Sequence, residues 1–68
     1  MMKSALIESR KLIGIQEAAD YLGISKNTLY GWVNMKKIPY YKISRLLKFT
    51  LDDLNEWVTE QKVEAIKF

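Results

Sequence analysis

Basic residues without any acid occupy the middle third of this sequence. The segment 26–48 contains no aspartate or glutamate, whereas acidic residues occur on both sides of it. A basic segment between acidic ones is typical of a surface that binds a polyanion. The alternative is a solvated basic face that binds nothing. The basic residues of the segment are Lys26, Lys36, Lys37, Lys42, Arg45 and Lys48.

Missing residue types exclude several kinds of chemistry. The 68 residues contain no cysteine and no histidine, which excludes disulfides, thiol chemistry and the two commonest zinc ligands. Asp52 and Asp53 are adjacent carboxylates, but they fall at the expected start of a helix, where the helix dipole explains them. The sequence has no base–nucleophile pair and no glycine-rich phosphate loop. We therefore expect no enzymatic activity, no metal and no cofactor.

Length and hydropathy predict a single small domain. Two hydrophobic cores do not fit into 68 residues, while 49% hydrophobic residues argue against a disordered chain. No apolar run approaches the ~20 residues of a membrane span, and charges interrupt the N-terminal segment where a signal peptide is apolar. We expect a cytoplasmic protein with no membrane contact.

Two short helices joined by a tight turn are predicted for residues 15–35. Gly14 is an acceptable N-cap for the first helix, and Glu17 is placed to complete a capping box. Gly23 should end this helix in the left-handed conformation. Ser25 is a preferred N-cap, so a second helix should follow over residues 26–35. The apolar positions at helical spacing are Ile15, Ala18, Ala19, Leu22, Leu29, Trp32 and Val33.

A β-hairpin is predicted after Pro39, which cannot continue a helix. The segments 40–43 and 46–49 are rich in β-branched and aromatic residues, with Ser44 and Arg45 as the connecting turn. We expect one face to be buried and the other to point outward. The expected buried residues are Tyr41, Ile43, Leu47 and Phe49, and the outward ones are Tyr40, Lys42, Leu46 and Lys48.

A last helix is predicted to begin after Thr50 and to end near residue 62. Thr50 and Asp53 form a second capping-box pattern. The expected fold is mainly α with a small β-hairpin: a helix-turn-helix unit, a hairpin wing and a closing helix. We expect residues 1–11 to be a flexible N-terminal arm, 12–62 the domain and 63–68 a C-terminal tail. The apolar stripe of the last helix is Leu51, Leu54, Trp57 and Val58.

Residues 12–58 resemble the excisionase-type, MerR-like winged helix-turn-helix family. The resemblance consists of short motifs that occur in the family's order and spacing, and it implies a winged helix-turn-helix fold that binds DNA. Two positions depart from the family pattern: Ser44 stands where a glycine often begins the wing turn, and Gly31 stands where a longer polar residue is frequent. The motifs are Glu17-Ala18-Ala19, Leu22 to Ser25, Thr28-Leu29-Tyr30, Lys37-Ile38-Pro39, Arg45 to Lys48, and Asp52 to Trp57.

The second helix is the expected recognition helix, because the N-terminal part of such a helix points at base edges. Asn27 has the donor and acceptor for bidentate reading of adenine, and Lys26 suits a guanine edge or a phosphate. Thr28 either caps the helix or contacts a phosphate, and Tyr30 is either fully outward or half-buried with its hydroxyl outward. The expected DNA-binding residues here are Ser25, Lys26, Asn27, Thr28, Tyr30 and Asn34.

The remaining basic residues are expected to contact phosphates from the wing and from the loop before it. Arg45, at the wing tip, is the candidate for insertion into the minor groove, since arginine is favoured where that groove is narrow. The alternative for Arg45 is a solvated hairpin tip. The residues of this second group are Lys36, Lys37, Lys42, Arg45 and Lys48.

The resemblance implies a role that the residues alone do not specify. We expect a nucleoid-associated excisionase, which binds double-stranded DNA, self-associates on it and directs the recombinase or integrase of a phage or mobile element. A small transcriptional regulator and a DNA-packaging subunit are alternatives with the same fold. A different class is a protein-interaction module that presents the acidic residues Glu56, Glu60 and Glu64 to a basic partner.

Overall fold

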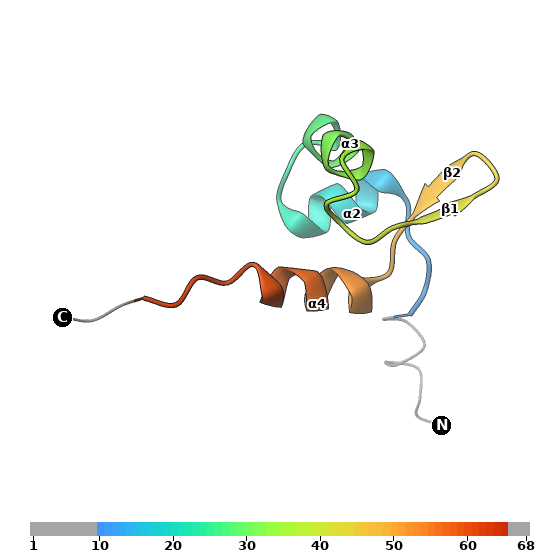
Figure 1. Ribbon diagram of the computed structural model, residues 1–68. Helices are drawn as coiled ribbons and strands as arrows, with labels where there is room; N and C mark the ends of the chain where they lie inside the picture. The colour runs from blue at the N-terminus through green and yellow to red at the C-terminus, as the bar shows by residue number, and fades with distance from the viewer. Residues whose placement is uncertain (1–9, 66–68) are drawn as a thin grey trace, which may run out of the picture.

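The computed structural model describes residues 10–65, in which a two-stranded hairpin follows a pair of short helices and precedes a last helix. The paired helices α2 (Ile15–Leu22) and α3 (Lys26–Asn34) lie above α4 (Leu51–Glu60), and the hairpin of β1 (Tyr41–Ile43) and β2 (Leu46–Lys48) projects to one side (Figure 1). This confirms the predicted fold class. Residues 1–9 of the expected arm and 66–68 of the expected tail lie outside the described residues.

The turn between α2 and α3 forms by the predicted local chemistry. Gly23 has a φ of 73°, and its N–H donates to the Asp20 carbonyl, while the Ile24 N–H donates to the Ala19 carbonyl. Ser25 then caps α3, because its hydroxyl oxygen accepts a hydrogen bond of 3.1 Å from the Thr28 N–H. At the start of α2, however, the side-chain hydrogen bonds of the described residues include none from the Gly14 N–H to Glu17, so the expected capping box does not form.

Helix α3 ends one residue earlier than predicted, in a turn built without glycine. The Lys36 N–H donates to the Val33 carbonyl and the Lys37 N–H to the Trp32 carbonyl, both at 2.9 Å. These two bonds define the Schellman motif, whose left-handed residue is usually glycine. Here Lys36 takes that position with a φ of 56°. The chain thus reverses direction at a lysine and enters the hairpin.

The hairpin is confirmed, and Phe49 and Leu47 face the core as expected, but the predicted grouping of residues on its two faces was wrong. The register pairs Ile43 with Leu46 and Lys42 with Leu47 across the two-residue turn. Directly opposite residues share a face of an antiparallel pair, so Ile43 lies with Leu46 and cannot lie with Leu47. Tyr41, like Ile43, is exposed, whereas Tyr40, expected outside, packs against the core.

The core lies between the helix pair, the base of the wing and α4. The chain before α2 contributes to it, since Ile13 forms an antiparallel bridge with Phe49 through N–H···O bonds of 2.7 and 2.9 Å. No local pattern had indicated this bridge. The fully or almost fully buried apolar residues are Ile13, Ala18, Ala19, Leu29, Val33, Ile38, Phe49 and Leu54.

Helix α4 is fixed to the helix pair and to the turn after α3 by an aromatic contact and a side-chain hydrogen bond. The rings of Trp32 and Trp57 lie 5.5 Å apart between centroids, and the Trp57 indole N–H donates to the Lys37 carbonyl at 2.7 Å. Both rings pack against the core, as expected from their spacing. Val58 does not: its side chain is exposed, so the buried stripe of α4 is narrower than predicted. The helix also ends at Glu60, two residues before the expected end near residue 62.

Candidate nucleic-acid interface

The exposed side of α3 carries the residues expected to read bases. Leu29 and Val33 are buried on the opposite side and hold the helix against α2. Lys26, Asn27 and Tyr30 are exposed at the N-terminal part of the helix. Asn34 continues the same strip at the C-terminal end, four residues after Tyr30, and is also exposed. Because one side of α3 is buried, the amide, ammonium and phenol groups of its exposed residues lie together on the other side.

Two of the expected DNA-binding residues, Ser25 and Thr28, hydrogen-bond to each other. The Ser25 hydroxyl donates to Thr28 Oγ1 at 3.0 Å and accepts from the Thr28 N–H. Ser25, not Thr28, is therefore the cap of α3. Since a hydroxyl is both a donor and an acceptor, Thr28 keeps a hydrogen that it can donate to a phosphate oxygen. Ser25 therefore stabilises the N-terminal end of α3, and it affects a ligand only by holding that end of the helix in place.

Three of the expected phosphate-binding residues converge on one hollow between α3 and the wing. Lys36 comes from the turn after α3, Lys42 from β1 and Arg45 from the hairpin turn, and all three line this hollow. Asn34 and Tyr40 complete its polar lining. The hollow encloses about 370 Å³, which is large enough for a phosphate group. Residues from three separate elements thereby place cationic side chains around one hollow.

A second hollow lies beside the wing strand β2 and the start of α2. Arg45 lines this hollow too, together with Lys48 and the recognition-helix residue Tyr30. Lys48 is half-buried, although it was expected to point fully outward. Lys26 and Lys37 are exposed but line neither hollow. The structure therefore brings Arg45 next to both α3 and the other wing cations, which its sequence position did not indicate.

The basic residues of this region are not neutralised within the domain. Over residues 10–65 the ion pairs are Arg10–Asp52 at 3.9 Å and Lys62–Glu64 at 3.7 Å, and all four side chains are strongly exposed. Neither pair includes a residue of the basic segment 26–48. Acidic side chains gather instead along α4, where Asp53, Glu56 and Glu60 line a third hollow with Trp57. Charge is thus separated between the wing and the last helix.

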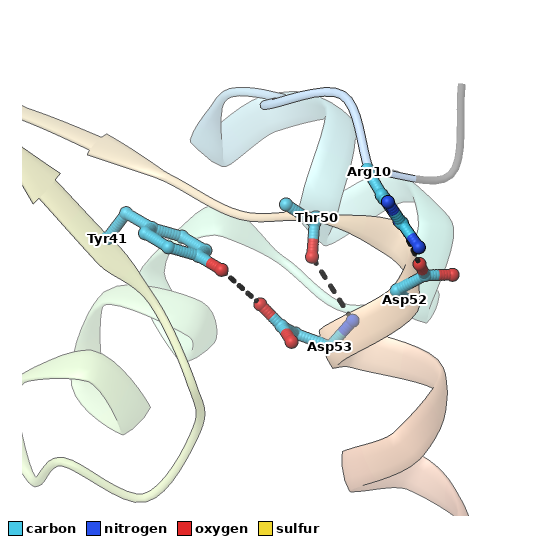
Figure 2. Close-up of polar contacts among 5 residues, drawn as sticks. All are labelled: Arg10, Tyr41, Thr50, Asp52 and Asp53. Atoms are coloured by element: carbon cyan, nitrogen blue, oxygen red, sulfur yellow. Dashed lines mark hydrogen bonds and ion pairs between the residues drawn. The ribbon is translucent and has the colours of Figure 1, made fainter. Parts of the chain in front are cut away.

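A hydrogen bond that the sequence did not indicate ties the wing to α4. The Tyr41 hydroxyl donates to Asp53 Oδ2 at 2.8 Å, while the Asp53 N–H donates to the Thr50 hydroxyl (Figure 2). The bond and the negative charge of Asp53 both favour the neutral phenol, so the pKa of Tyr41 lies above its ordinary value. Asp53 therefore completes the cap of α4 with its N–H and anchors the wing with its carboxylate.

Two further findings concern metal ions and membranes. Within the described part of the chain, no three histidine, cysteine or acidic residues are grouped so that they could hold a metal ion. None of the helices there is long and apolar enough to cross a membrane.

Comparison with known proteins agrees with this geometry. No curated protein and no solved structure matched the chain. The family model described as "Helix-turn-helix domain" matches residues 12–62, which include α2, α3, the wing and α4. The match covers most of the 68 residues. The chain therefore belongs to this helix-turn-helix domain family, whose fold indicates DNA binding.

Proposed function

We propose that this protein binds a specific sequence in double-stranded DNA, with α3 in the major groove and the wing against the neighbouring backbone and minor groove. The observation that carries the proposal is the hollow shared by Lys36, Lys42 and Arg45 beside the exposed strip of α3. Asn27 and Tyr30 on that strip supply base-edge contacts. The unpaired cations supply the sequence-independent attraction to phosphates.

The biological role that we propose is that of an excisionase, which acts at the nucleoid and has no catalytic activity of its own. The support is the ordered set of family motifs in residues 12–58. On this proposal the protein self-associates on neighbouring sites and directs a recombinase or integrase. A small transcriptional regulator would use the same DNA contacts. An integrase gene beside this one, and excision that requires both proteins, would distinguish the first role from the second.

The first experiment is a selection of bound duplexes from a random pool, followed by anisotropy titrations at several salt concentrations. We expect an enriched sequence, and a log–log salt slope that falls by ~0.9 for each phosphate contact removed. Lys42→Ala should reduce the slope, whereas Lys62→Ala removes the same charge from a residue paired with Glu64 and should not. Asn27→Ala should relax the sequence preference while changing the slope little.

Two outcomes would contradict the proposal in different ways. Salt-dependent binding without sequence enrichment would leave a non-specific DNA binder and remove the assigned roles of Asn27 and Tyr30. No binding at low salt would overturn DNA binding altogether. In that case the acidic hollow of α4, lined by Asp53, Glu56 and Glu60 around Trp57, would favour a protein-interaction module, and charge reversal at Glu60 would test it.

A further inference from the structure

Two large apolar side chains are exposed at the tip of a basic wing. Ile43 and Leu46 flank the two-residue turn, and 46% and 58% of their surfaces are accessible. They are directly paired across the hairpin, so they lie side by side on one face. The wing projects from the helices at this point, and the core of the domain does not cover the pair (Figure 1).

The charged side chains of the hairpin itself are all cationic, although Tyr41, on the same face as the pair, binds the Asp53 carboxylate of α4. Arg45 lies between the two residues in the chain, and Lys48 follows Leu46 on the same face of β2. An apolar patch within a uniformly basic hairpin does not match an apolar protein surface, because its cations would be buried without partners. It does match the minor groove, which has phosphates on both rims and stacked bases at its floor.

Leu46 also connects the wing tip with the recognition helix. Leu46 lines the hollow that contains Tyr30 of α3, together with Arg45 and Lys48, whereas Ile43 lines neither hollow beside the wing. A duplex held against the exposed strip of α3 therefore also faces Leu46. Through Leu46, the apolar pair therefore adjoins the DNA surface described above.

We propose that Ile43 and Leu46 form an apolar wedge that enters the minor groove beside Arg45, partly unstacks one base step and bends the duplex. This inference rests on the proposed DNA binding and adds a second mode of recognition to it. Leucine and isoleucine wedges in other minor-groove proteins kink DNA by about 20–90°. Pyrimidine–purine steps are the easiest to unstack, so the wing selects TA or CA/TG at a position where it makes no base-specific hydrogen bond.

The test compares the wild-type protein with the double variant Ile43→Thr/Leu46→Thr on the selected duplex. Threonine keeps the β-branching that suits a strand but shortens and polarises the wedge. Val58→Thr is the matched control, since Val58 is 45% exposed on α4, away from the wing. Circular dichroism and thermal unfolding confirm that all variants fold. The readouts are the fluorescence of 2-aminopurine at the step facing the wing, and energy transfer between dyes on the duplex ends.

For the wild type and Val58→Thr we expect increased 2-aminopurine fluorescence and a shorter end-to-end distance on binding. For the double variant we expect both changes to fall by at least half, with an affinity loss of about tenfold that is largest on TA-containing sites. An equal fluorescence change in the double variant, with specific binding intact, would overturn the wedge alone. An unbent duplex with wild-type protein would do the same, as would a loss of self-association in the double variant without any change in DNA shape. Failure of the wild type to bind any duplex would overturn the proposed function as well.

Discussion

The Tyr41 hydroxyl donates a 2.8 Å hydrogen bond to the Asp53 carboxylate and so connects the first wing strand to the start of the last helix (Figure 2). Asp53 is also the residue whose N–H binds the Thr50 cap. One residue therefore fixes both the beginning of α4 and the base of the wing. Because the wing has only three residues in each strand, such a connection at its base determines where its tip lies.

This bond predicts an alkaline pH dependence. It raises the pKa of Tyr41 above its ordinary value, so the neutral phenol is favoured in the folded state. The contribution to stability is present below the unfolded-state pKa and is lost as the pH rises through the raised folded-state pKa. We expect Asp53→Asn to return the titration of Tyr41 toward its ordinary range, measured from tyrosinate absorbance.

The titration of Tyr41 is isolated by subtracting the Tyr41→Phe curve from that of the wild type. Tyr21→Phe serves as the control, because Tyr21 donates to the uncharged amide of Asn55 and its removal should leave the Tyr41 titration in place. An unchanged Tyr41 titration in Asp53→Asn would contradict the assigned role of the Asp53 carboxylate.

The cap of α3 predicts a separation of stability from DNA binding. Ser25→Ala removes the acceptor for the Thr28 N–H and should cost about 1 kcal/mol in the free energy of unfolding. Ser25→Asp keeps an acceptor there and should unfold close to the wild type in urea. Its negative charge, however, lies at the end of α3 that faces DNA and should weaken binding. A Ser25→Asp variant that binds as tightly as the wild type would contradict this orientation of α3.

The turn between α2 and α3 was predictable because the signals that set it are local. Gly23 and Ser25 each act within one turn of their own position, through a left-handed backbone and a side-chain cap respectively. The exposed strip of α3 followed from helical spacing once Leu29 and Val33 were taken as buried. The resemblance in residues 12–58 predicted the wing from the order of its motifs.

The hairpin faces and the shape of the site were not predictable in the same way. The two-residue turn already required Ile43 to face with Leu46, a constraint that the hydrophobic alternation obscured. The Ile13–Phe49 bridge joins distant residues that have no local signal for pairing. Lys36 and Lys42 line the same hollow because the chain turns at Lys36 with a left-handed backbone. Glycine is the usual residue at such a position, so the sequence did not indicate the turn.

That left-handed lysine predicts a substitution that stabilises the fold and weakens DNA binding. Lys36→Gly removes the conflict between a Cβ atom and a positive φ, and should raise the free energy of unfolding by about 1 kcal/mol. It also removes one phosphate contact, so the salt slope should fall by ~0.9. Lys36→Ala is the comparison, because it loses the charge but keeps the Cβ. Equal unfolding free energies for the glycine and alanine variants would contradict the strain at this position.

The wing turn predicts a stabilising substitution that leaves the charge unchanged. Ser44 has a φ of 57° at the first turn position, which favours glycine in the tight turns that suit hairpins. We expect Ser44→Gly to raise the free energy of unfolding by up to about 1 kcal/mol and to slow hydrogen exchange of the paired wing amides. The salt slope of DNA binding should not change, because no charge is lost.

Arg45→Gly is the matched control for the turn, since Arg45 is not among the residues with positive φ. A glycine at position 45 relieves no backbone strain, and it increases the conformational entropy of the unfolded chain. The free energy of unfolding should therefore fall. The salt slope should also fall, because Arg45 lines both hollows beside the wing. If Ser44→Gly and Arg45→Gly changed stability in the same direction, the left-handed backbone at Ser44 would not be what limits the stability of the wing.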